Sequence, residues 1–420
     1  MIQQTNISFG IQSRLPRLSE AEEKEKRPRK AGTLVTLSCI IFLFYLAQAQ
    51  FRPTLPRYIE SNGGGEAEVG FIIFLNWAAQ AAFSVPLGAF SDRVGKRAVI
   101  MLGGVIAAVG FAVLPAMSTV LLILLAYAAA GVGQAGYSAA TAAYSVDLSR
   151  REHTARAIAW TQAARQSALS FGPALGGILA VLLGVGNVFI SSALLVIAGV
   201  LFSWFLLKDL PQTSKGLQKE DGGGGSGWLI LRKPLILASL IGIFSLQFGN
   251  SVFVSFTPLY ANQLSVAVIG VIFTVQGIVN AVGRPIIGEL SDRIRNPKPV
   301  ILLSMLAGAA GLFLLSFSAE FELLILVALL IGLSTGIGVV LFLTIIVEQV
   351  PKQNQGFTMG FFNMSLYLGL GIGPAVEGLV IENSGYLTAF RSAGLIPLAG
   401  AIIFFALSNK EKKQERVNSG

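Results

Sequence analysis

Three charged side chains inside apolar segments are the residues of this sequence most able to do chemistry. They are Arg165, Arg284 and Glu377. A charge in mid-membrane is costly, so such a residue points to a function or to a buried ion pair. We expect Arg165 to face a cavity and attract an anionic group or order a gate, with a structural carboxylate pair as the alternative. Burial favours a neutral carboxyl group, so Glu377 is the candidate proton carrier unless it lies at the outer mouth. Arg284 is closer to one membrane surface and fits an inner gate better than a substrate contact.

Uncharged amide and phenol side chains form a second set of candidate substrate contacts. They are Tyr45, Gln48, Gln134, Tyr137, Gln247, Asn250, Gln276 and Asn280. Each side chain is as well suited to a hydrogen bond between helices as to a ligand contact. Together they predict a mostly apolar cavity with few polar groups. Such a cavity suits an amphipathic organic substrate better than a sugar.

Other chemistries find no support in the residue content. One His and one Cys cannot build a zinc site of the usual kind, so we expect no metal and no cofactor. No cluster of a nucleophile, a base and an orienting group is visible, and we expect no enzymatic activity. The net charge of +9 could suggest nucleic-acid binding, but the positive residues lie in short segments between apolar runs. We therefore expect no nucleic-acid partner.

The elements that must position these residues are long apolar runs. The chain has 420 residues, 53% hydrophobic and 13% charged, whereas soluble domains carry about 25% charged residues. A bilayer core about 30 Å thick requires about 20 apolar residues in a helix, and only helices satisfy their own backbone there. We predict an all-α membrane protein with twelve such helices, at about residues 34–51, 69–91, 98–116, 119–144, 155–183, 187–207, 235–260, 267–290, 299–317, 323–347, 356–382 and 388–408.

The distribution of Lys and Arg predicts the orientation of these helices. With the N-terminus in the cytoplasm, 26 of the 31 Lys and Arg residues fall on the cytoplasmic side and three on the other. An even helix count preserves this asymmetry, which follows the positive-inside rule. We predict a multi-pass protein of a cell membrane, the bacterial inner membrane, with both termini cytoplasmic and in contact with the lipid bilayer.

The two halves of the sequence repeat each other at an offset of 200 or 201 residues. Matching groups include Ser91-Asp92-Arg93 with Ser291-Asp292-Arg293 and Gly172-Pro173-Ala174 with Gly373-Pro374-Ala375. Repeated halves joined by a linker are a mark of transporters whose site lies between the halves. We predict two pseudo-symmetric six-helix bundles, with an N-terminal tail (1–32), a first bundle (33–207), a linker (208–233), a second bundle (234–408) and a C-terminal tail (409–420).

One connector carries a specific motif: Gly88, Asp92, Arg93, Gly95, Lys96 and Arg97, with a degraded second copy at Gly288, Asp292 and Arg293. It resembles the motif between helices 2 and 3 of the major facilitator superfamily, a resemblance that covers nearly all of residues 33–408. The resemblance implies a latch that closes the inner side. We expect Gly88 to allow close helix approach, Asp92 to accept hydrogen bonds from a helix N-terminus, and Arg93 and Arg97 to pair with Asp147. The repeat adds Asp292, Arg293, Arg284 and Glu348 to this set.

The segment Gly172-Pro173-x-x-Gly176-Gly177 resembles a motif of the drug-efflux branch of that superfamily. Its glycines are expected to allow tight helix packing against the other half, as are Gly373 and Pro374 in the second copy. One departure is Tyr127, which stands where the branch usually has an arginine before Gly131-Val132-Gly133. The usual proton-coupling scheme of the branch is therefore in doubt here.

The resemblance also implies that helices 1, 4, 7 and 10 line the cavity. None has an acidic residue in its middle, which favours neutral or anionic substrates over cationic ones. We expect a monomeric alternating-access transporter that exports small amphipathic organic molecules and uses protons. The alternatives are uptake of a metabolite by proton symport or facilitated diffusion, and a membrane sensor or scaffold that does not transport.

Overall fold

The computed structural model describes residues 16–148, 154–208, 231–291, 297–317, 319–350 and 355–418. Their order along the chain is α1 (Pro16–Gln50), α2 (Leu55–Ser61), α3 (Glu66–Val94), α4 (Lys96–Val113), η1 (Leu114–Ala116), α5 (Val120–Leu148), α6 (Thr154–Leu183), α7 (Val185–Leu206), α9 (Pro234–Tyr260), α10 (Val266–Ser291), α11 (Lys298–Leu315), α12 (Phe321–Gln349) and α13 (Gln355–Asn418).

Eleven helices of this described part are long and apolar enough to cross a membrane. The last of them, α13, is two helices that meet at Gly385, where φ is 79°. Only glycine adopts this backbone conformation at little cost, so the chain turns there without a longer loop. Dividing α13 at Gly385 gives twelve crossing segments, and the predicted all-α membrane fold is confirmed.

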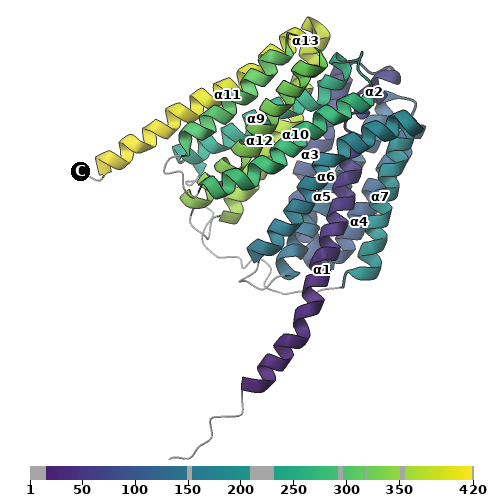
Figure 1. Cartoon of the computed structure of the whole chain (residues 1–420), viewed down its shortest axis with the longest axis vertical. Coiled ribbons are helices and arrows are strands. Elements are labelled where there is room, and N and C mark those ends of the chain that lie inside the picture. Colours follow the sequence, from purple (N-terminus) through teal and green to yellow (C-terminus); the bar gives the residue numbers. More distant parts are fainter. Residues whose placement is uncertain are drawn as a thin grey trace, which may run out of the picture.

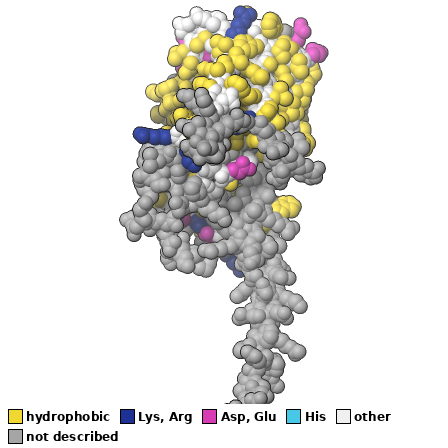
Figure 2. Space-filling view, turned by 90° about the vertical axis from the view of Figure 1, so that its left-hand side faces the viewer, with side chains coloured by type: hydrophobic (Ala, Val, Ile, Leu, Met, Phe, Trp, Pro, Cys, Tyr) yellow, Lys and Arg dark blue, Asp and Glu magenta, His cyan; other side chains and the backbone are white. Residues whose placement is uncertain are grey.

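Large apolar side chains cover the outside of the helices. Val85, Leu182, Phe205 and Phe317 are each more than 70% exposed. Figure 2 shows such side chains as a broad apolar surface, with charged side chains toward the upper edge. In water this surface would be strongly unfavourable, whereas lipid tails solvate it. The chain is therefore a multi-pass membrane protein.

The helices form two bundles that lie side by side (Figure 1). The first contains α1 and α3 to α7, and the second contains α9 to α13. Two pairs of helices make the main contact between them: α3 with α13, and α6 with α10. The pairs are related by the sequence repeat, so the interface has the pseudo-symmetry that the sequence predicts.

At one end of the molecule, the bundles touch backbone to backbone. A Cβ built on Gly70 would lie 2.0 Å from the Pro374 carbonyl oxygen, and one on Gly270 would lie 2.4 Å from that of Pro173. Gly177 and Gly378 make the corresponding contacts with the first turns of α10 and α3. We call this region, defined by Gly70, Gly177, Gly270 and Gly378 with their partners, the closed end.

Candidate functional site

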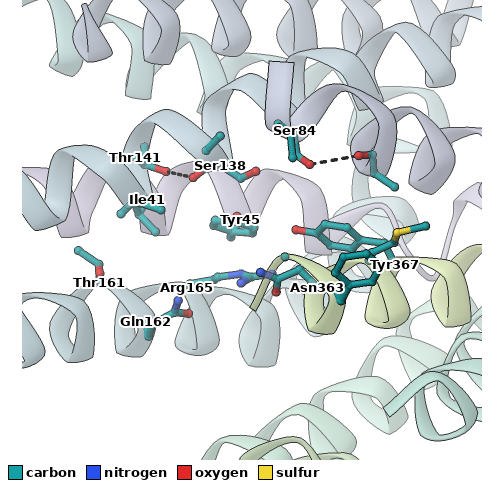
Figure 3. A pocket seen from close by; sticks show the side chains of 17 residues that line it. Ile41, Tyr45, Ser84, Ser138, Thr141, Thr161, Gln162, Arg165, Asn363 and Tyr367 are labelled. Atoms are coloured by element: carbon teal, nitrogen blue, oxygen red, sulfur yellow. Dashed lines mark hydrogen bonds between the residues drawn. The ribbon is translucent and has the colours of Figure 1, made fainter. Parts of the chain in front are cut away.

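A cavity of about 680 Å³ lies between the bundles, away from the closed end. The first bundle contributes side chains from α1, α3, α5 and α6, and the second contributes the start of α13 (Figure 3). The lining residues are Ile41, Tyr45, Ala81, Ser84, Val85, Ser138, Ala139, Thr141, Ala142, Thr161, Gln162, Arg165, Gly360, Phe361, Asn363, Met364 and Tyr367. The lining is thus mostly apolar, with hydroxyl, amide and phenol groups and one arginine.

Arg165 is the one charged residue among those lining residues. Its guanidinium carbon lies 4.7 Å from the centre of the Tyr45 ring, a cation–π distance. Its Nε is buried and has no hydrogen-bond partner. Among the described residues, the ion pairs within 4.0 Å all involve Lys96, so no carboxylate neutralises Arg165. Arg165 thus lines the cavity, and its expected role toward an anion or a gate stays a prediction. Among the described residues, the alternative of a structural pair with a carboxylate is not seen.

Aromatic side chains close the cavity on the side of the closed end. Tyr367 of α13 stacks on Trp77 of α3, with ring centroids 5.7 Å apart. Figure 3 shows Arg165 extending from α6 toward Asn363 and Tyr367, with the Tyr45 ring above its guanidinium group. The sequence reasoning did not single out Asn363 or Tyr367 as site residues. Their spacing of four, together with Gly360, places them on one face of a helix and is the signal that could have identified them.

The charged and aromatic residues of this cavity lie between two repeated halves, which is the arrangement of a transporter. A family model described as Major Facilitator Superfamily matches residues 37–267 and 240–420. The chain belongs to the major facilitator superfamily. Its members are transporters that bind small molecules, not enzymes, so the predicted absence of enzymatic activity is confirmed.

Relatives within the superfamily cover nearly the whole chain. Multidrug resistance protein 2 of Bacillus subtilis is 24% identical over 405 residues, which is 94% of this chain and 98% of that protein. Quinolone resistance protein NorA of Staphylococcus aureus is 21% identical over 388 residues, 90% and 97% of the two chains. A bacterial homologue of the human lysosomal transporter Spinster, in an inward-facing and occupied conformation, has a similar fold: its TM-score is 0.76 at 16% identity, covering 91% of this chain and 98% of that one. The predicted likeness to the drug-efflux branch of the superfamily is thus supported.

The predicted amide contacts are mainly hydrogen bonds between helices in this member of the superfamily. Gln48 donates to Gln134 inside the first bundle. Gln276 donates to Asn250 at 2.6 Å, and Asn280 donates to the Thr335 hydroxyl at 2.7 Å. These bonds satisfy buried amides and fix neighbouring helices relative to one another.

Two further predicted contacts also lie inside the bundles. The hydroxyl of Tyr137 donates to the carbonyl oxygen of Ile40 at 2.9 Å, and its ring stacks on Phe44. Gln247 is buried where α9 meets Gly369 of α13. Of the predicted substrate-binding set, Tyr45 and Arg165 are therefore the members that line the described cavity.

Arg284 occupies the position in the second half that Ser84 occupies in the first. Ser84 lines the cavity, so the pseudo-symmetry directs Arg284 toward the same central space. Its Nε donates to Asn280 Oδ1 at 2.9 Å. No carboxylate of the described chain lies within ion-pair distance of it, and the predicted pairing with Asp147 or Glu348 is absent from this structure.

Arg52, just beyond the end of α1, is a further cation without an ion pair among the described residues. Along the chain it lies about two helical turns beyond Tyr45 and about one turn beyond Gln48, on the side of the closed end. Burial lowers its pKa below the ordinary value, Tyr127 opposes this lowering, and the positive charge of Arg165 adds to it.

Glu377 is 2% exposed and lies near the closed end rather than in the cavity. The Ser392 hydroxyl donates to its Oε2 at 2.7 Å. The next residue, Gly378, packs against Glu66 and Ala67 at the start of α3. A change at this carboxyl group would therefore act on the contact between the halves.

The segment 88–97 lies at the end of the molecule opposite the closed end, which we call the open end. Lys96 pairs with Asp147, and it lies 3.8 Å from the Asp92 carboxylate. The expected pairing of Asp147 with Arg93 or Arg97 is wrong for this structure, since Lys96 takes that carboxylate; Arg97 instead donates to the Trp204 carbonyl oxygen.

The expected close approach at Gly88 is also missing. Its nearest neighbour is Ala139, 3.7 Å from a built Cβ, which is an ordinary contact. Asp92 makes no hydrogen bond with a facing helix N-terminus within the described residues, and its side chain is 46% exposed. Glu348 is exposed, and the predicted gate residues Asp292 and Arg293 lie outside the described residues. Within the described residues, Lys96 and Arg97 of the latch motif contact residues of their own half.

The Gly-Pro segments divide their contacts between the two halves. Gly172 and Gly176 pack against Ala49 and Gln50 of α1 in their own bundle, so the expectation that they contact the other half is wrong. Pro173 and Gly177 do reach the other half. The second copy behaves alike: Gly373 packs on α9 of its own bundle, and Pro374 meets Gly70 across the interface.

Proposed function

We propose that this chain is a proton-coupled exporter of small amphipathic organic molecules, neutral or anionic, that works by alternating access. The observation that carries the proposal is the asymmetry of the interface. One end is closed through backbone contacts at four glycines, and a cavity between the same two halves lies away from it. Rocking the halves about the cavity would exchange which end is closed.

The charge distribution supports a cytoplasmic opening of this cavity. The segment 88–97 carries Arg93, Lys96 and Arg97, and Arg150 and Arg151 follow α5 in the sequence. The positive-inside rule assigns such residues to the cytoplasmic side. In this orientation both termini are cytoplasmic and the structure is inward-open. We propose that the segment 88–97 engages the second half when the inner side closes.

Export, rather than uptake, is supported by the relatives. Proteins named for multidrug and quinolone resistance align with over nine-tenths of this chain. The cavity fits such substrates, because Tyr45, Phe361, Met364 and Tyr367 offer apolar and aromatic contact to an amphipathic molecule.

For the proton, we propose Glu377 as the carrier. It is a buried carboxyl group held by one hydroxyl, next to a glycine of the closed end. Protonation would remove its charge and change the packing of α13 against α3 and Ser392. Proton binding would thus be coupled to the opening of the closed end rather than to direct contact with the substrate.

The decisive experiment is transport by purified protein in proteoliposomes with an imposed pH gradient. We expect proton movement, followed with a trapped pH indicator, on addition of an amphipathic compound to which expressing cells become resistant. The Arg165→Gln variant should insert normally and lose this flux. Flux of the compound without proton movement would identify facilitated diffusion, and sensitisation of expressing cells would identify uptake.

A further inference from the structure

We propose that Arg165 and Arg284, assisted by Arg52, form one binding site for an amphipathic organic anion with two negatively charged groups. The inference rests on the proposed transport function and narrows its substrate class. It assigns to the anion a second role, as the bridge that allows the open end to close.

The first observation is that positive charge in the central space is uncompensated. Arg52, Arg165 and Arg284 have no carboxylate within ion-pair distance in the described chain. Asp92 and Asp147 follow the cavity-lining residues of α3 and α5 along the chain. Both carboxylates already lie close to Lys96 at the open end. Burying part of an unpaired charge, as at Arg165 Nε, is costly, and binding of an anion would relieve that cost.

The second observation is that donors remain available. The guanidinium group of Arg165 lies over the Tyr45 ring, and its Nε is buried without a hydrogen-bond partner. Arg284 uses Nε on Asn280. The terminal nitrogens of both guanidinium groups make no hydrogen bond to any described residue. Two forks of this kind match two carboxylate, sulfonate or phosphate groups.

The third observation is that the two arginines belong to opposite halves. Arg165 lies on α6 of the first bundle and Arg284 on α10 of the second. The two helices pack against each other near these residues: a Cβ built on Gly277 of α10 would lie 2.6 Å from the Ser170 Cα of α6. Arg165 lies five residues before Ser170 and Arg284 seven residues after Gly277, both on the side away from the closed end. Closing the open end would bring the two cations closer, so repulsion between them opposes closure in the empty transporter.

An anion placed between the two arginines reverses the sign of this interaction. It attracts both guanidinium groups and therefore stabilises the closed arrangement more than the open one. Such differential stabilisation is what a ligand needs to shift a conformational equilibrium. Arg52 lies beyond Tyr45 toward the closed end and adds positive charge on that side of the site.

The aromatic residues indicate the remainder of the molecule. Tyr45 and Tyr367 both lie near the guanidinium end of Arg165 (Figure 3), and Trp77 stacks on Tyr367. A flat apolar group between the anionic groups would stack there, whereas a small inorganic anion would leave these faces without contact. The predicted ligand is thus an aromatic or otherwise apolar dianion.

A set of naphthalene compounds that differ mainly in charge tests this site directly. Naphthalene-2,6-dicarboxylate, 2-naphthoate, 2-naphthamide and 2-naphthylmethylammonium are titrated against the full-length protein in lipid nanodiscs by isothermal calorimetry, at low salt. We expect the dicarboxylate to bind most tightly and the ammonium compound least. Sulfate is the probe for the charge alone and should bind more weakly than the dicarboxylate.

Arginine variants assign the preference to these residues. Arg165→Gln and Arg284→Gln should each weaken dicarboxylate binding by about tenfold or more, since a charged hydrogen bond contributes about 1.5–3 kcal/mol. Binding of 2-naphthamide should change little. Arg165→Lys keeps the charge and should retain part of the preference. Arg391→Gln removes an arginine at the outer end of the last crossing segment and is the control that should match the unmodified protein.

A spectroscopic readout tests the bridging role. Spin labels at Ala142 on α5 and Gly283 on α10, in a Cys39→Ser background, report the separation of the halves. The dicarboxylate should shorten this distance, and the amide should not; in Arg284→Gln the shortening should disappear. Melting temperatures without ligand identify any variant that fails to fold.

Two outcomes overturn the proposal: equal binding of the dicarboxylate and the amide, or an unchanged anion preference in both glutamine variants. These outcomes are distinct from failure of the proposed export. A protein that binds the dianion through these arginines but shows no proton-coupled flux would refute export alone. A protein that exports neutral compounds with no anion preference would refute this site alone.

Discussion

The closed end and the open end of the interface are held by different physical means. At the closed end, glycines bring helix backbones together, and a built Cβ at Gly70 would overlap the Pro374 carbonyl group. At the open end, the described contacts are those of charged side chains, such as Lys96 with Asp147, within one half. Close packing of helix backbones depends on matching shapes, so a contact of this kind is either formed or broken. The strength of contacts between charged side chains also depends on pH, salt and bound ligand. The comparison suggests that shape defines the closed state and that charge controls access to it.

A second element of the closed end is a clamp made by Arg57. From α2 it donates to the carbonyl oxygens of Pro258, Ala261 and Leu264, at 2.8, 3.1 and 2.8 Å. These oxygens are at or just beyond the end of α9, where a helix leaves its last carbonyl groups unsatisfied and favours a cation. Burial lowers the pKa of Arg57 and Glu60 raises it, but an arginine remains charged at neutral pH. The sequence analysis gave Arg57 no role.

The largest effect is expected from Gly70→Val. The added side chain must displace the Pro374 carbonyl group, and overpacking of this kind costs about 3 kcal/mol, equivalent to a roughly hundredfold loss of the closed population. Spin labels at the exposed positions Glu60 and Asn262, on opposite halves, measure that population in a Cys39→Ser background.

Gly283→Val is the matched control, because a Cβ there meets nothing within 4 Å. It should leave the closed-end distance unchanged. If Gly70→Val keeps the closed-end distance and the transport rate, backbone packing does not define the closed state.

Arg57→Gln should have the next largest effect. Glutamine cannot reach three carbonyl oxygens, and the loss of charged hydrogen bonds should increase the separated population about tenfold, since each factor of ten corresponds to about 1.4 kcal/mol. The same label pair measures it. Arg57→Lys should behave almost like the glutamine variant, because a single ammonium lacks the forked donors; full rescue by lysine would show that charge alone suffices.

Glu377→Gln should alter pH dependence more than folding. The amide still accepts the Ser392 hydrogen bond but cannot take up or release a proton. The transport rates at about pH 6 and about pH 8 should become equal, with the unmodified protein differing several-fold. Glu382→Gln, an exposed carboxylate nearby on the same helix, is the control. Retention of the normal pH profile in Glu377→Gln would remove this residue from the coupling scheme.

Asp147→Asn should have the smallest effect on stability. Its ion pair with Lys96 lies at the partly exposed open end, where such pairs contribute about 1 kcal/mol or less. The free energy of unfolding, measured with denaturant in detergent, should therefore change little. The same result is expected for the exposed Glu348→Gln. A loss of several kcal/mol would mean that the open end is held together as firmly as the closed end.

Much of the site could be anticipated from residue type and spacing. A lone arginine such as Arg165 deep in an apolar helix has few roles open to it, and its place in a cavity follows from the cost of burying a charge in lipid. The floor of the cavity could not be anticipated in this way. Trp77 and Tyr367 are ordinary members of apolar helices in sequence, and their stacking depends on how α3 and α13 are rotated toward each other.

The sequence by itself determined the number of membrane crossings, their orientation signal, the twofold repeat and the residue types between the halves. These features follow from local rules, because lipid demands helices of a set length and tolerates few charges. Only the tertiary structure decided which partner each residue has: Gly177 faces the other half while Gly176 faces its own, and Asp147 pairs with Lys96 rather than with an arginine. Neighbouring positions on a helix point about 100° apart, so partner choice depends on helix rotation and crossing geometry, which no single segment encodes.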